Sequence, residues 1–267
     1  MNAHTRWITL DGAVNVRDLG GLPTADGRTT RRGRALRADN LQDLTVTDIR
    51  TLLDDYSLKN VIDLRSGAEV DLEGPGPLTR VPSVTIHHLS LFPEGGRHTD
   101  VAADTPKVDI DRVLPWQNRP DMGAENDRSI HHYLGYMRDR ADSIVAALRV
   151  MARTDGSALV HCAAGKDRTG VVCALALEVA GVTREAVVTD YAQTGDRLEA
   201  ILGRLRSSTT YAEDIDSRPA DSHLPRADIM EKFLTRLDEQ HGGALDWLAA
   251  NGWTPEDTTA LQARLLD

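Results

Sequence analysis

The chain has 267 residues, of which 40 % are hydrophobic, and this is enough apolar material for the core of one large or two small domains. Its 41 acidic and 31 basic residues give a formal net charge of −10. That balance disfavours long-range attraction to nucleic acid or to an anionic membrane surface, so an anionic ligand has to be captured locally.

Cysteine content and the absence of targeting signals indicate a reducing compartment. The chain contains two cysteines, Cys162 and Cys173, which are too few for a disulfide framework. The first residues lack the apolar stretch of a secretory signal, and no apolar run is long enough to span a bilayer. We therefore expect a cytoplasmic protein without an integral membrane segment, and export without a signal peptide stays open.

Short strands and one helix are expected in the first third of the chain. Residues 14–39 carry turn signals between short apolar stretches, which predicts small strands at one edge of a sheet. Thr45 is typical of an N-cap, and an amphipathic helix is expected to follow it through Leu53. Residues 60–64 and 84–89 each predict a short buried strand.

The middle of the chain changes character twice. From about residue 92 to 129 no periodicity is visible over a stretch too long for an ordinary connection, which predicts a loop-rich insert. Apolar residues at helical spacing then predict a helix over 130–152. A short apolar strand over 157–161 and a buried helix over 169–180 are expected next.

The last third is predicted to be helical. Helices are expected near 183–205, 226–240 and 254–265, with a polar loop over 207–225. Strands and helices alternate before this portion, which indicates an α/β fold whose sheet is mostly parallel.

One segment carries a recognisable chemical pattern, and it reads His161-Cys-Ala-Ala-Gly-Lys-Asp-Arg-Thr-Gly170. A tight loop before a helix N-terminus points successive backbone N–H groups inward and forms a nest for an anion. Residues 163–168 would supply those amides, and Gly165 would permit the close turn. The planar guanidinium of Arg168 would bind two phosphate oxygens at once. The segment therefore predicts a cradle for a phosphate group.

Cys162 begins this loop as a candidate nucleophile. The helix N-terminus and neighbouring cations favour its thiolate, and Thr169 could donate a hydroxyl to that thiolate when it departs. The alternative is a small buried core cysteine, which is the usual role of an isolated cysteine. The spacing from Cys162 to Arg168, between an apolar strand and an apolar helix, favours the catalytic interpretation. Cys173, inside that helix, is expected to pack in the core.

The loop resembles the cysteine phosphatase signature His-Cys-x5-Arg-Thr/Ser-Gly, and in its detail it is similar to the bacterial protein tyrosine/serine phosphatase family. Other segments also resemble landmarks of this family, namely residues 15–21, 36–39, 61–66 and 190–191 and Gly242, Gly243, Leu248 and Gly252. The resemblance covers nearly the whole chain. It implies one catalytic domain over residues 1–267, with the insert around 92–129 and a helical lid and C-terminal portion around 183–267.

This resemblance implies a phosphatase-type α/β fold, with a central, mostly parallel sheet flanked by helices, that works without a metal or another cofactor. It implies a phosphocysteine intermediate on Cys162 and a catalytic role for Arg168. The remaining phosphate-binding positions would be Ala163, Ala164, Gly165, Lys166 and Thr169. Lys166 is similar to the basic loop residue of lipid phosphatases related to tensin. Family members act on phosphotyrosine, on phosphoserine or phosphothreonine, and sometimes on phosphoinositides.

Two residues are candidates for the proton donor. Many cysteine phosphatases use an aspartate on an upstream aromatic-Pro-Asp loop, and Phe92-Pro93-Glu94 is the nearest counterpart here. The branch that this chain resembles carries an aspartate inside the loop itself, so Asp167 is the first choice and Glu94 the second. The alternative for Asp167 is that it only pairs with a nearby arginine.

Several other charged residues have both a possible functional role and a purely structural one. Asp63 and Arg65 follow a buried strand and either orient Arg168 or the loop, or form a plain ion pair. His161 could order the loop through a backbone hydrogen bond. One basic cluster fits a solvated strand face better than a guide for anionic substrates, and it comprises Arg28, Arg31, Arg32, Arg34 and Arg37.

Competing functions differ in what they ask of the loop. A sulfurtransferase has a tighter loop than the five residues between Cys162 and Arg168, and a non-catalytic phosphate-binding module needs no nucleophile. The histidine pairs 87–88 and 131–132 diverge in direction, so no metal site is expected. We expect a phosphoric monoester hydrolase of the protein tyrosine phosphatase type, with dual-specificity or phosphoinositide activity open. The alternative is a phosphatase of a small sugar, nucleotide or inositol phosphate, and the 4 % aromatic content offers few stacking walls.

Overall fold

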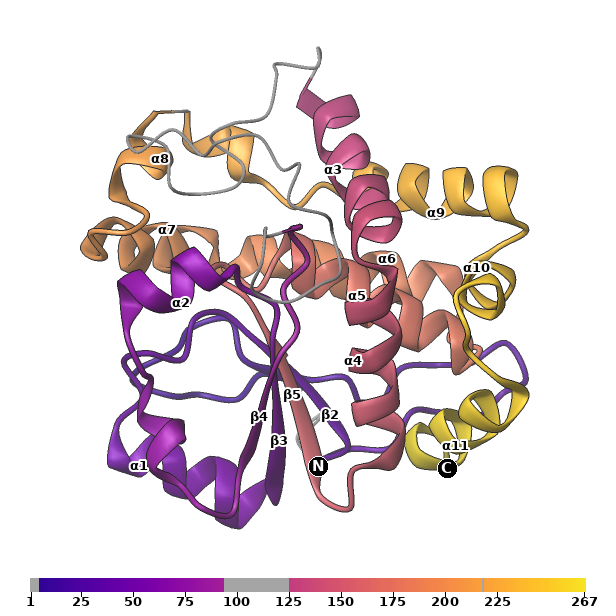
Figure 1. Ribbon diagram of the computed structural model, residues 1–267, viewed down its shortest axis with the longest axis horizontal. Helices are drawn as coiled ribbons and strands as arrows, with labels where there is room; N and C mark the ends of the chain where they lie inside the picture. Colours follow the sequence, from indigo (N-terminus) through magenta and orange to yellow (C-terminus); the bar gives the residue numbers. More distant parts are fainter. Residues whose placement is uncertain (1–4, 94–124, 218) are drawn as a thin grey trace.

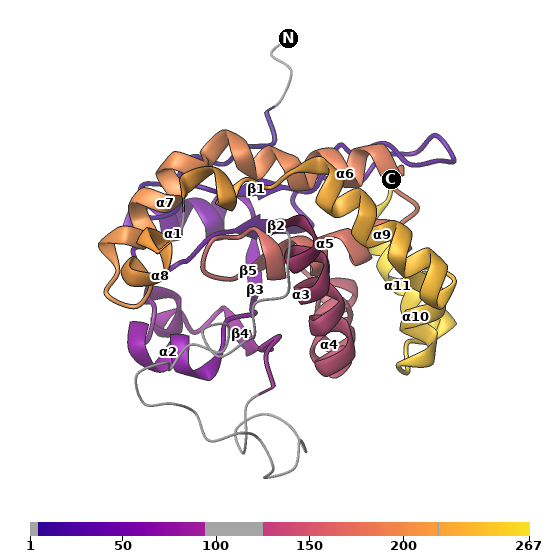
Figure 2. The ribbon, with the colours of Figure 1, turned by 90° about the horizontal axis from the view of Figure 1, so that it is seen from above.

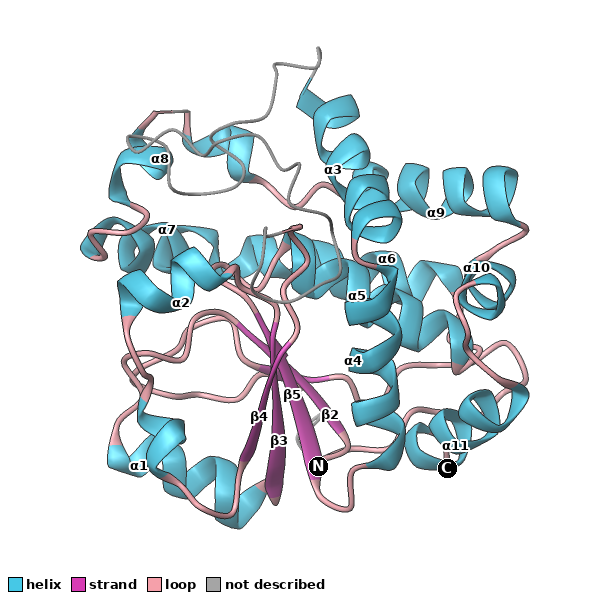
Figure 3. Cartoon of the chain, in the orientation of Figure 1, coloured by secondary structure: helices cyan, strands magenta, loops and turns pink. Residues whose placement is uncertain are grey.

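A five-stranded sheet forms the centre of the molecule (Figure 1; Figure 3). The computed structural model describes residues 5–93, 125–217 and 219–267. The strand order is β1-β2-β5-β3-β4, and every neighbouring pair is parallel except β1 with β2. The strands are β1 (Arg17–Asp18), β2 (Ala35–Ala38), β3 (Leu58–Asp63), β4 (Thr85–His88) and β5 (Ser157–His161). The α/β fold with a mostly parallel sheet is confirmed. Of the strands expected over 14–39, β1 lies at the edge, whereas β2 pairs with β5 inside the sheet.

Side chains alternate across the sheet and separate two hydrophobic cores. In β5, Ala158 and Val160 contribute to the larger core, whereas Leu159 faces the smaller one. Leu159 is in register with Leu36 of β2 and Val61 of β3, which belong to the same smaller core. A strand with helices on both faces buries both sets of side chains, so all five residues of β5 are buried.

Helices cover the two faces unequally. The smaller core is closed by α1 (Val46–Arg50) and the π-helical turn Thr51–Asp55 that continues it. The larger core contains α5 (Asp167–Val179), which is buried almost throughout. The other helices that contribute to the larger core are α3 (Glu125–Asp139), α4 (Ala141–Arg153), α6 (Arg184–Ala192), α9 (Ala227–His241), α10 (Ala244–Ala250) and α11 (Pro255–Leu265).

Two short helices pack in a hydrophobic cluster that is separate from both cores. Helix α7 (Leu198–Ser207) and α8 (Ala212–Asp216) share a third, small apolar cluster with Ala163. Seen from above, α7 and α8 lie on one side of the start of α5, and α3 lies on the other (Figure 2). This arrangement leaves the end of β5 and the start of α5 between them. Within the described ranges, no helix combines the length and apolar character needed to cross a bilayer.

Several expected boundaries need correction. The helix expected over 130–152 is two helices, since Arg140 leaves helical geometry with φ −139° and ψ 45°. At this break the buried Arg140 guanidinium donates to the Phe92 carbonyl at 3.1 Å and to Ser143 Oγ at 2.5 Å. Helix α3 also begins at Glu125, so the end of the expected insert is helical.

The helical last third is divided more finely than expected. A 3-10 turn over 193–197 separates α6 from α7, and the expected loop over 207–225 contains α8 and a 3-10 turn over 220–223. Helix α2 (Gly67–Glu73) was not expected either, although Ser66 and Glu69 form a capping box at its start. The expected caps at Thr45 and Thr254 are both present.

Candidate active site

The loop over residues 162–168, here named the Cys162 loop, is fixed through its carbonyl groups. The Ala163 carbonyl accepts from the Asn40 backbone N–H at 2.9 Å, and the Ala164 carbonyl accepts from Asn15 Nδ2 at 2.9 Å. Gly165 has φ +65°, and a Cβ atom there would lie 2.4 Å from the Ala38 carbonyl oxygen. Only glycine therefore fits at this position, as expected.

The direction of these carbonyls determines where the loop amides point. In a planar trans peptide the N–H of the following residue points away from the C=O. Because the carbonyls of Ala163 and Ala164 face the scaffold, the N–H groups of Ala164 and Gly165 face the other side, toward the pocket. The N-terminus of α5 adds its positive partial charge at the same place. The loop is thus a cradle for an anion.

Cys162 lies at the base of this cradle. Its side chain is almost fully buried, yet it lines the pocket above the loop. Thr169, in the first turn of α5, donates its hydroxyl to Sγ of Cys162 at 3.2 Å. The hydrogen bond expected from the sequence is therefore present.

Arg168 is held by a carboxylate that the sequence interpretation missed. Its two terminal nitrogens donate to the two oxygens of Glu69 at 2.6 and 2.9 Å. Glu69 also accepts from the Ser66 backbone N–H at 2.7 Å and from the Tyr211 hydroxyl at 3.1 Å. Burial opposes the charge of both partners, but their attraction lowers the pKa of Glu69 and raises the pKa of Arg168 well above its usual value. Phe92 packs against the same guanidinium, 5.2 Å from ring centre to Cζ.

Asp63 and Arg65 form an ion pair beside the loop and do not hold Arg168. Their closest atoms are 2.6 Å apart. The carboxylate of Asp63 is also 3.6 Å from Nε2 of His161. Burial, which Asp63 only partly offsets, lowers the pKa of His161 to about 4, so the imidazole is neutral at pH 7. His161 Nδ1 lies 3.3 Å from the Cys162 carbonyl, the backbone contact that we expected.

A buried charged network lies under the Cys162 loop and is here named the floor; it comprises Asn15, Arg17, Arg37 and Asp190, each at most 1 % exposed. Asp190 accepts from Arg17 Nε at 3.1 Å and from Arg37 Nη1 at 2.6 Å. The other terminal nitrogen of Arg37 donates to the Gly165 carbonyl at 2.8 Å. Burial opposes ionisation of Asp190, but the arginines hold its pKa well below its usual range.

The expectation that Arg37 belongs to a solvated strand face is therefore wrong. Alternation along β2 places Arg37 on the face of Ala35, which is the face covered by α5 and α6. Arg28 does fit the solvated interpretation, since its ion pair with Asp26 is exposed.

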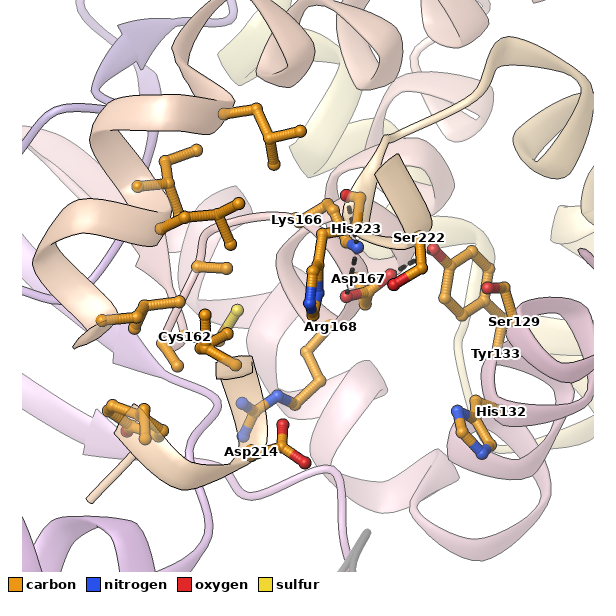
Figure 4. A pocket seen from close by; sticks show the side chains of 18 of the residues that line it. Ser129, His132, Tyr133, Cys162, Lys166, Asp167, Arg168, Asp214, Ser222 and His223 are labelled. Atoms are coloured by element: carbon orange, nitrogen blue, oxygen red, sulfur yellow. Dashed lines mark hydrogen bonds and ion pairs between the residues drawn. The ribbon is translucent and has the colours of Figure 1, made fainter. Parts of the chain in front are cut away.

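Asp167 projects from the first turn of α5 and is a third exposed, with 35 % of its side chain accessible. Its Oδ1 accepts from the Tyr133 hydroxyl at 2.5 Å, and its Oδ2 lies 3.6 Å from Lys166 Nζ, as the dashed lines in Figure 4 mark. Burial favours the neutral acid, but Lys166 and the Tyr133 hydroxyl lower the pKa of Asp167. The alternative that Asp167 only pairs with a nearby arginine is not what we find. Its oxygens contact Tyr133 and Lys166, whereas Arg168 pairs with Glu69. Glu94, the second candidate donor, lies outside the described residues.

A pocket of about 170 Å³ opens above Cys162 (Figure 4). Cavities of this size hold a group such as a benzene ring. One wall, here named the roof, consists of apolar side chains of α7 and α8 and the turn between them, and it comprises Ile201, Leu202, Leu205, Tyr211 and Ile215. Aromatic side chains that line the pocket are Phe92, Tyr133, Tyr136 and Tyr211. The chain has only two Phe and five Tyr, so folding gathers more than half of them here.

Basic side chains also line the pocket. Arg128 and His132 of α3 and Lys166 of the loop are among the lining residues. Lys166 Nζ donates to the His223 carbonyl at 2.9 Å, which ties the Cys162 loop to the segment after α8. Among the residues that the structure describes, no group of three His, Cys, Asp or Glu side chains is arranged to hold a metal ion.

Glu69, Tyr133 and Tyr211 are the site residues that sequence reasoning missed. For Glu69 a signal existed, because Ser66-x-x-Glu69 is a capping-box pattern directly after the strand ending at Asp63. Nothing in that pattern shows that the carboxylate reaches Arg168, 99 residues later. For the two tyrosines the sequence carries no comparable signal.

Comparison with known proteins agrees with this geometry. The model of the tyrosine phosphatase family matches residues 8–267. The triple specificity protein phosphatase PtpB of Mycobacterium tuberculosis is 29 % identical over 96 % of this chain and 98 % of its own length. A tyrosine-protein phosphatase of Nostoc commune is 29 % identical over 86 % of this chain and 73 % of its own length. The resemblance drawn from the loop is confirmed, and the chain belongs to the tyrosine phosphatase family.

Proposed function

We propose that the chain hydrolyses phosphate monoesters through a covalent phosphocysteine on Cys162. The observation that carries this proposal is the Cys162 loop, whose carbonyls are bound from below while Sγ of Cys162 lines the pocket above. As a member of its family, the chain is a phosphoric monoester hydrolase of the protein tyrosine phosphatase type.

In the first step the Cys162 thiolate attacks phosphorus, so that an S–P bond forms and the bond to the leaving oxygen breaks. The other three phosphate oxygens lie against the amides of residues 163–168 and against Arg168. A guanidinium has five N–H donors in a rigid fork, so Arg168 can hold Glu69 along one edge and bind phosphate as well. Donors fixed before the reaction stabilise the charge that spreads over these oxygens in the transition state.

Asp167 is the proposed proton donor. In the free enzyme its carboxyl is ionised, and the negative charge of a bound phosphate raises its pKa again. Asp167 therefore takes up a proton from solvent when substrate binds, and it then gives this proton to the leaving oxygen. In the second step it takes a proton from the water that attacks phosphorus, the S–P bond breaks, and the hydroxyl of Thr169 stabilises the departing thiolate.

Replacement of the acid tests this role. Asp167→Asn should lower kcat by about 10²- to 10³-fold on phosphotyrosine or alkyl phosphates, whose leaving groups need a proton. On p-nitrophenyl phosphate the loss should be a few-fold only. Glu94→Gln is the matched variant of the second candidate and should change neither. Equal losses on both substrates for Asp167→Asn would remove Asp167 from the mechanism.

Phosphotyrosine in proteins is the proposed principal substrate. The apolar roof and the aromatic side chains Phe92, Tyr136 and Tyr211 suit an aryl group above the phosphate cradle. Lys166, Arg128 and His132 also line the pocket and would lie near additional anionic groups of a substrate, which supports testing phosphoserine and phosphoinositide substrates. That one relative is named for triple specificity supports the same wider test. A small metabolite phosphate is the second candidate substrate, since Cys162 and its loop would bind and hydrolyse its phosphate group in the same way.

An activity panel separates these candidates. Phosphotyrosyl and phosphoseryl peptides, phosphoinositides, and sugar, nucleotide and inositol phosphates would be compared on wild type, Cys162→Ser and Cys173→Ser. Cys162→Ser should lose turnover on every substrate and retain binding of the best one, whereas Cys173→Ser, buried in α5, should keep turnover. Phosphate release by Cys162→Ser at the wild-type rate would overturn the covalent mechanism.

We also propose that the whole chain is one catalytic domain that acts on phosphorylated partners in the cytoplasm. Helices α9 to α11 bury their apolar side chains in the same core as β5, which supports a single unit. The two cysteines are unpaired and buried, as suits a reducing compartment. A single unfolding transition by circular dichroism and fluorescence would support one domain, and two separated transitions would contradict it.

A further inference from the structure

Two buried tyrosines form a hydrogen-bonded chain that ends on Asp167. The hydroxyl of Tyr133, on α3, lies 2.5 Å from Oδ1 of Asp167 and 2.7 Å from the hydroxyl of Tyr191, on α6. An ionised carboxylate can only accept, so the single proton of Tyr133 points to Asp167. Tyr133 therefore accepts from Tyr191. Both side chains are at most 2 % exposed, so water does not compete for these bonds.

Packing fixes both tyrosines in this arrangement. The ring of Tyr133 lies edge-on against Phe233 at 5.6 Å and against Tyr191 at 6.4 Å between ring centres. Tyr191 in turn lies on Gly170, where an added Cβ atom would come within 2.9 Å of the tyrosine ring. The glycine that ends the loop motif thus makes room for the tyrosine that supports the acid. Neither ring can turn without displacing the larger core.

We infer that Tyr133 is a positioning residue for the proton donor, and that Tyr191 fixes Tyr133 for this task. The inference rests on the proposed function, because it matters only if Asp167 exchanges protons with the leaving group. Holding Oδ1 leaves Oδ2 as the oxygen that faces Lys166 and the pocket. When Asp167 gives up its proton, the new carboxylate already has a hydrogen bond in place, and a bond made to the charged form lowers the barrier to losing the proton.

The electrostatic surroundings of Asp167 predict the direction of a pH effect. The groups that face it are Lys166 and Arg168 of its own segment, His132 and Tyr133 of α3, and Tyr191 of α6. The hydrogen bond from Tyr133 lowers the pKa of Asp167. Its removal therefore raises that pKa, so the pH at which activity declines on the alkaline side moves upward. A role confined to packing would not move it.

Tyr133→Phe and Tyr191→Phe test the inference, with Tyr56→Phe as the control for loss of a hydroxyl at the opposite end of β3. Tyr133→Phe should lower kcat on phosphotyrosine peptides about tenfold and on p-nitrophenyl phosphate less than twofold, with KM unchanged. The alkaline limb of its pH–activity profile should shift to higher pH. Tyr191→Phe should show the same changes in kcat and in the pH profile, but smaller. Tyr56→Phe should match wild type.

The outcomes separate this inference from the function on which it rests. Equal losses on both substrates, or an unmoved alkaline limb, would overturn the role of Tyr133 while Asp167→Asn still discriminates between leaving groups. If Asp167→Asn itself does not discriminate, the acid assignment fails and the tyrosine role fails with it. Thermal unfolding of each variant identifies one that has not folded, and Tyr191→Phe then decides the matter, because its hydroxyl does not touch Asp167.

Discussion

The floor and the roof hold opposite sides of the Cys162 loop by different means. The floor is fully buried: Asp190 pairs with Arg17 and Arg37, and the floor binds the loop by hydrogen bonds to its carbonyls. The roof contacts the loop through Ala163 in a small apolar cluster that is separate from both main cores. One side is polar and directional, and the other is apolar and non-directional.

This difference assigns different tasks to the two sides. Hydrogen bonds depend steeply on distance and angle, so the floor fixes the amides of the loop in one arrangement. Apolar contact depends mainly on area and tolerates small shifts, so the roof can adapt to the group above the phosphate. Floor variants should therefore change kcat and stability, whereas roof variants should change KM.

The largest effect is expected for Asp190→Ala. It leaves Arg17 and Arg37 buried without their counter-charge, which should cost about 3–5 kcal/mol of unfolding free energy. Urea unfolding would measure it. Asp238→Ala removes an exposed carboxylate that pairs with Arg184, and should cost less than about 1 kcal/mol. Similar costs for the two variants would mean that the floor does not support the fold.

A pH dependence of stability should arise from His161, the last residue of β5 before the Cys162 loop. The unfolded chain binds a proton on histidine near pH 6.5, whereas the folded chain binds it only near pH 4. The unfolded state therefore holds more protons in this window, and unfolding free energy rises with pH across it, by up to about 3 kcal/mol. His161→Gln should flatten the rise, and the exposed His241→Gln should not. An unchanged slope in His161→Gln would refute this origin.

Arg37→Lys tests the directional character of the floor. Lysine keeps the charge beside Asp190 but cannot also reach the Gly165 carbonyl with a second fixed donor. We expect kcat to fall about tenfold, corresponding to one lost hydrogen bond from a charged group, with KM nearly unchanged. Steady-state kinetics would show it, with the exposed Arg28→Lys as the control. A change confined to KM would assign Arg37 to substrate binding.

The smallest effect is expected in the roof. Leu202→Ala removes apolar contact worth about 1 kcal/mol to a bound aryl group, so KM for phosphotyrosine peptides should rise roughly fivefold at constant kcat. Leu245→Ala, half-exposed on α10, is the control and should leave both constants alone. A fall in kcat without a change in KM would place the roof among the parts that fix the loop.

The fold class and the local geometry of the Cys162 loop could be predicted from the sequence alone. Residues 157–180 are contiguous, so local geometry alone relates the strand, the turn at Gly165 and the helix N-terminus, and the side-chain pattern reveals each of them. Cys162, Arg168 and Thr169 could be placed for this reason. Strong caps such as Thr45 and Thr254 were also visible, because a cap acts within one helical turn.

The side chains that surround this loop could not be predicted in the same way. Glu69, Tyr133 and Asn15 reach it from separate elements, and no local pattern specifies which distant side chains a sheet and its helices will bring together. The low aromatic content was misleading for the same reason, since composition averages over the chain whereas folding concentrates residues at one place. Arg37 is the clearest example. In the sequence it belongs to a basic cluster that predicts a solvated surface, but pairing of β2 with β5 buries its side chain, which donates to the Gly165 carbonyl of the loop.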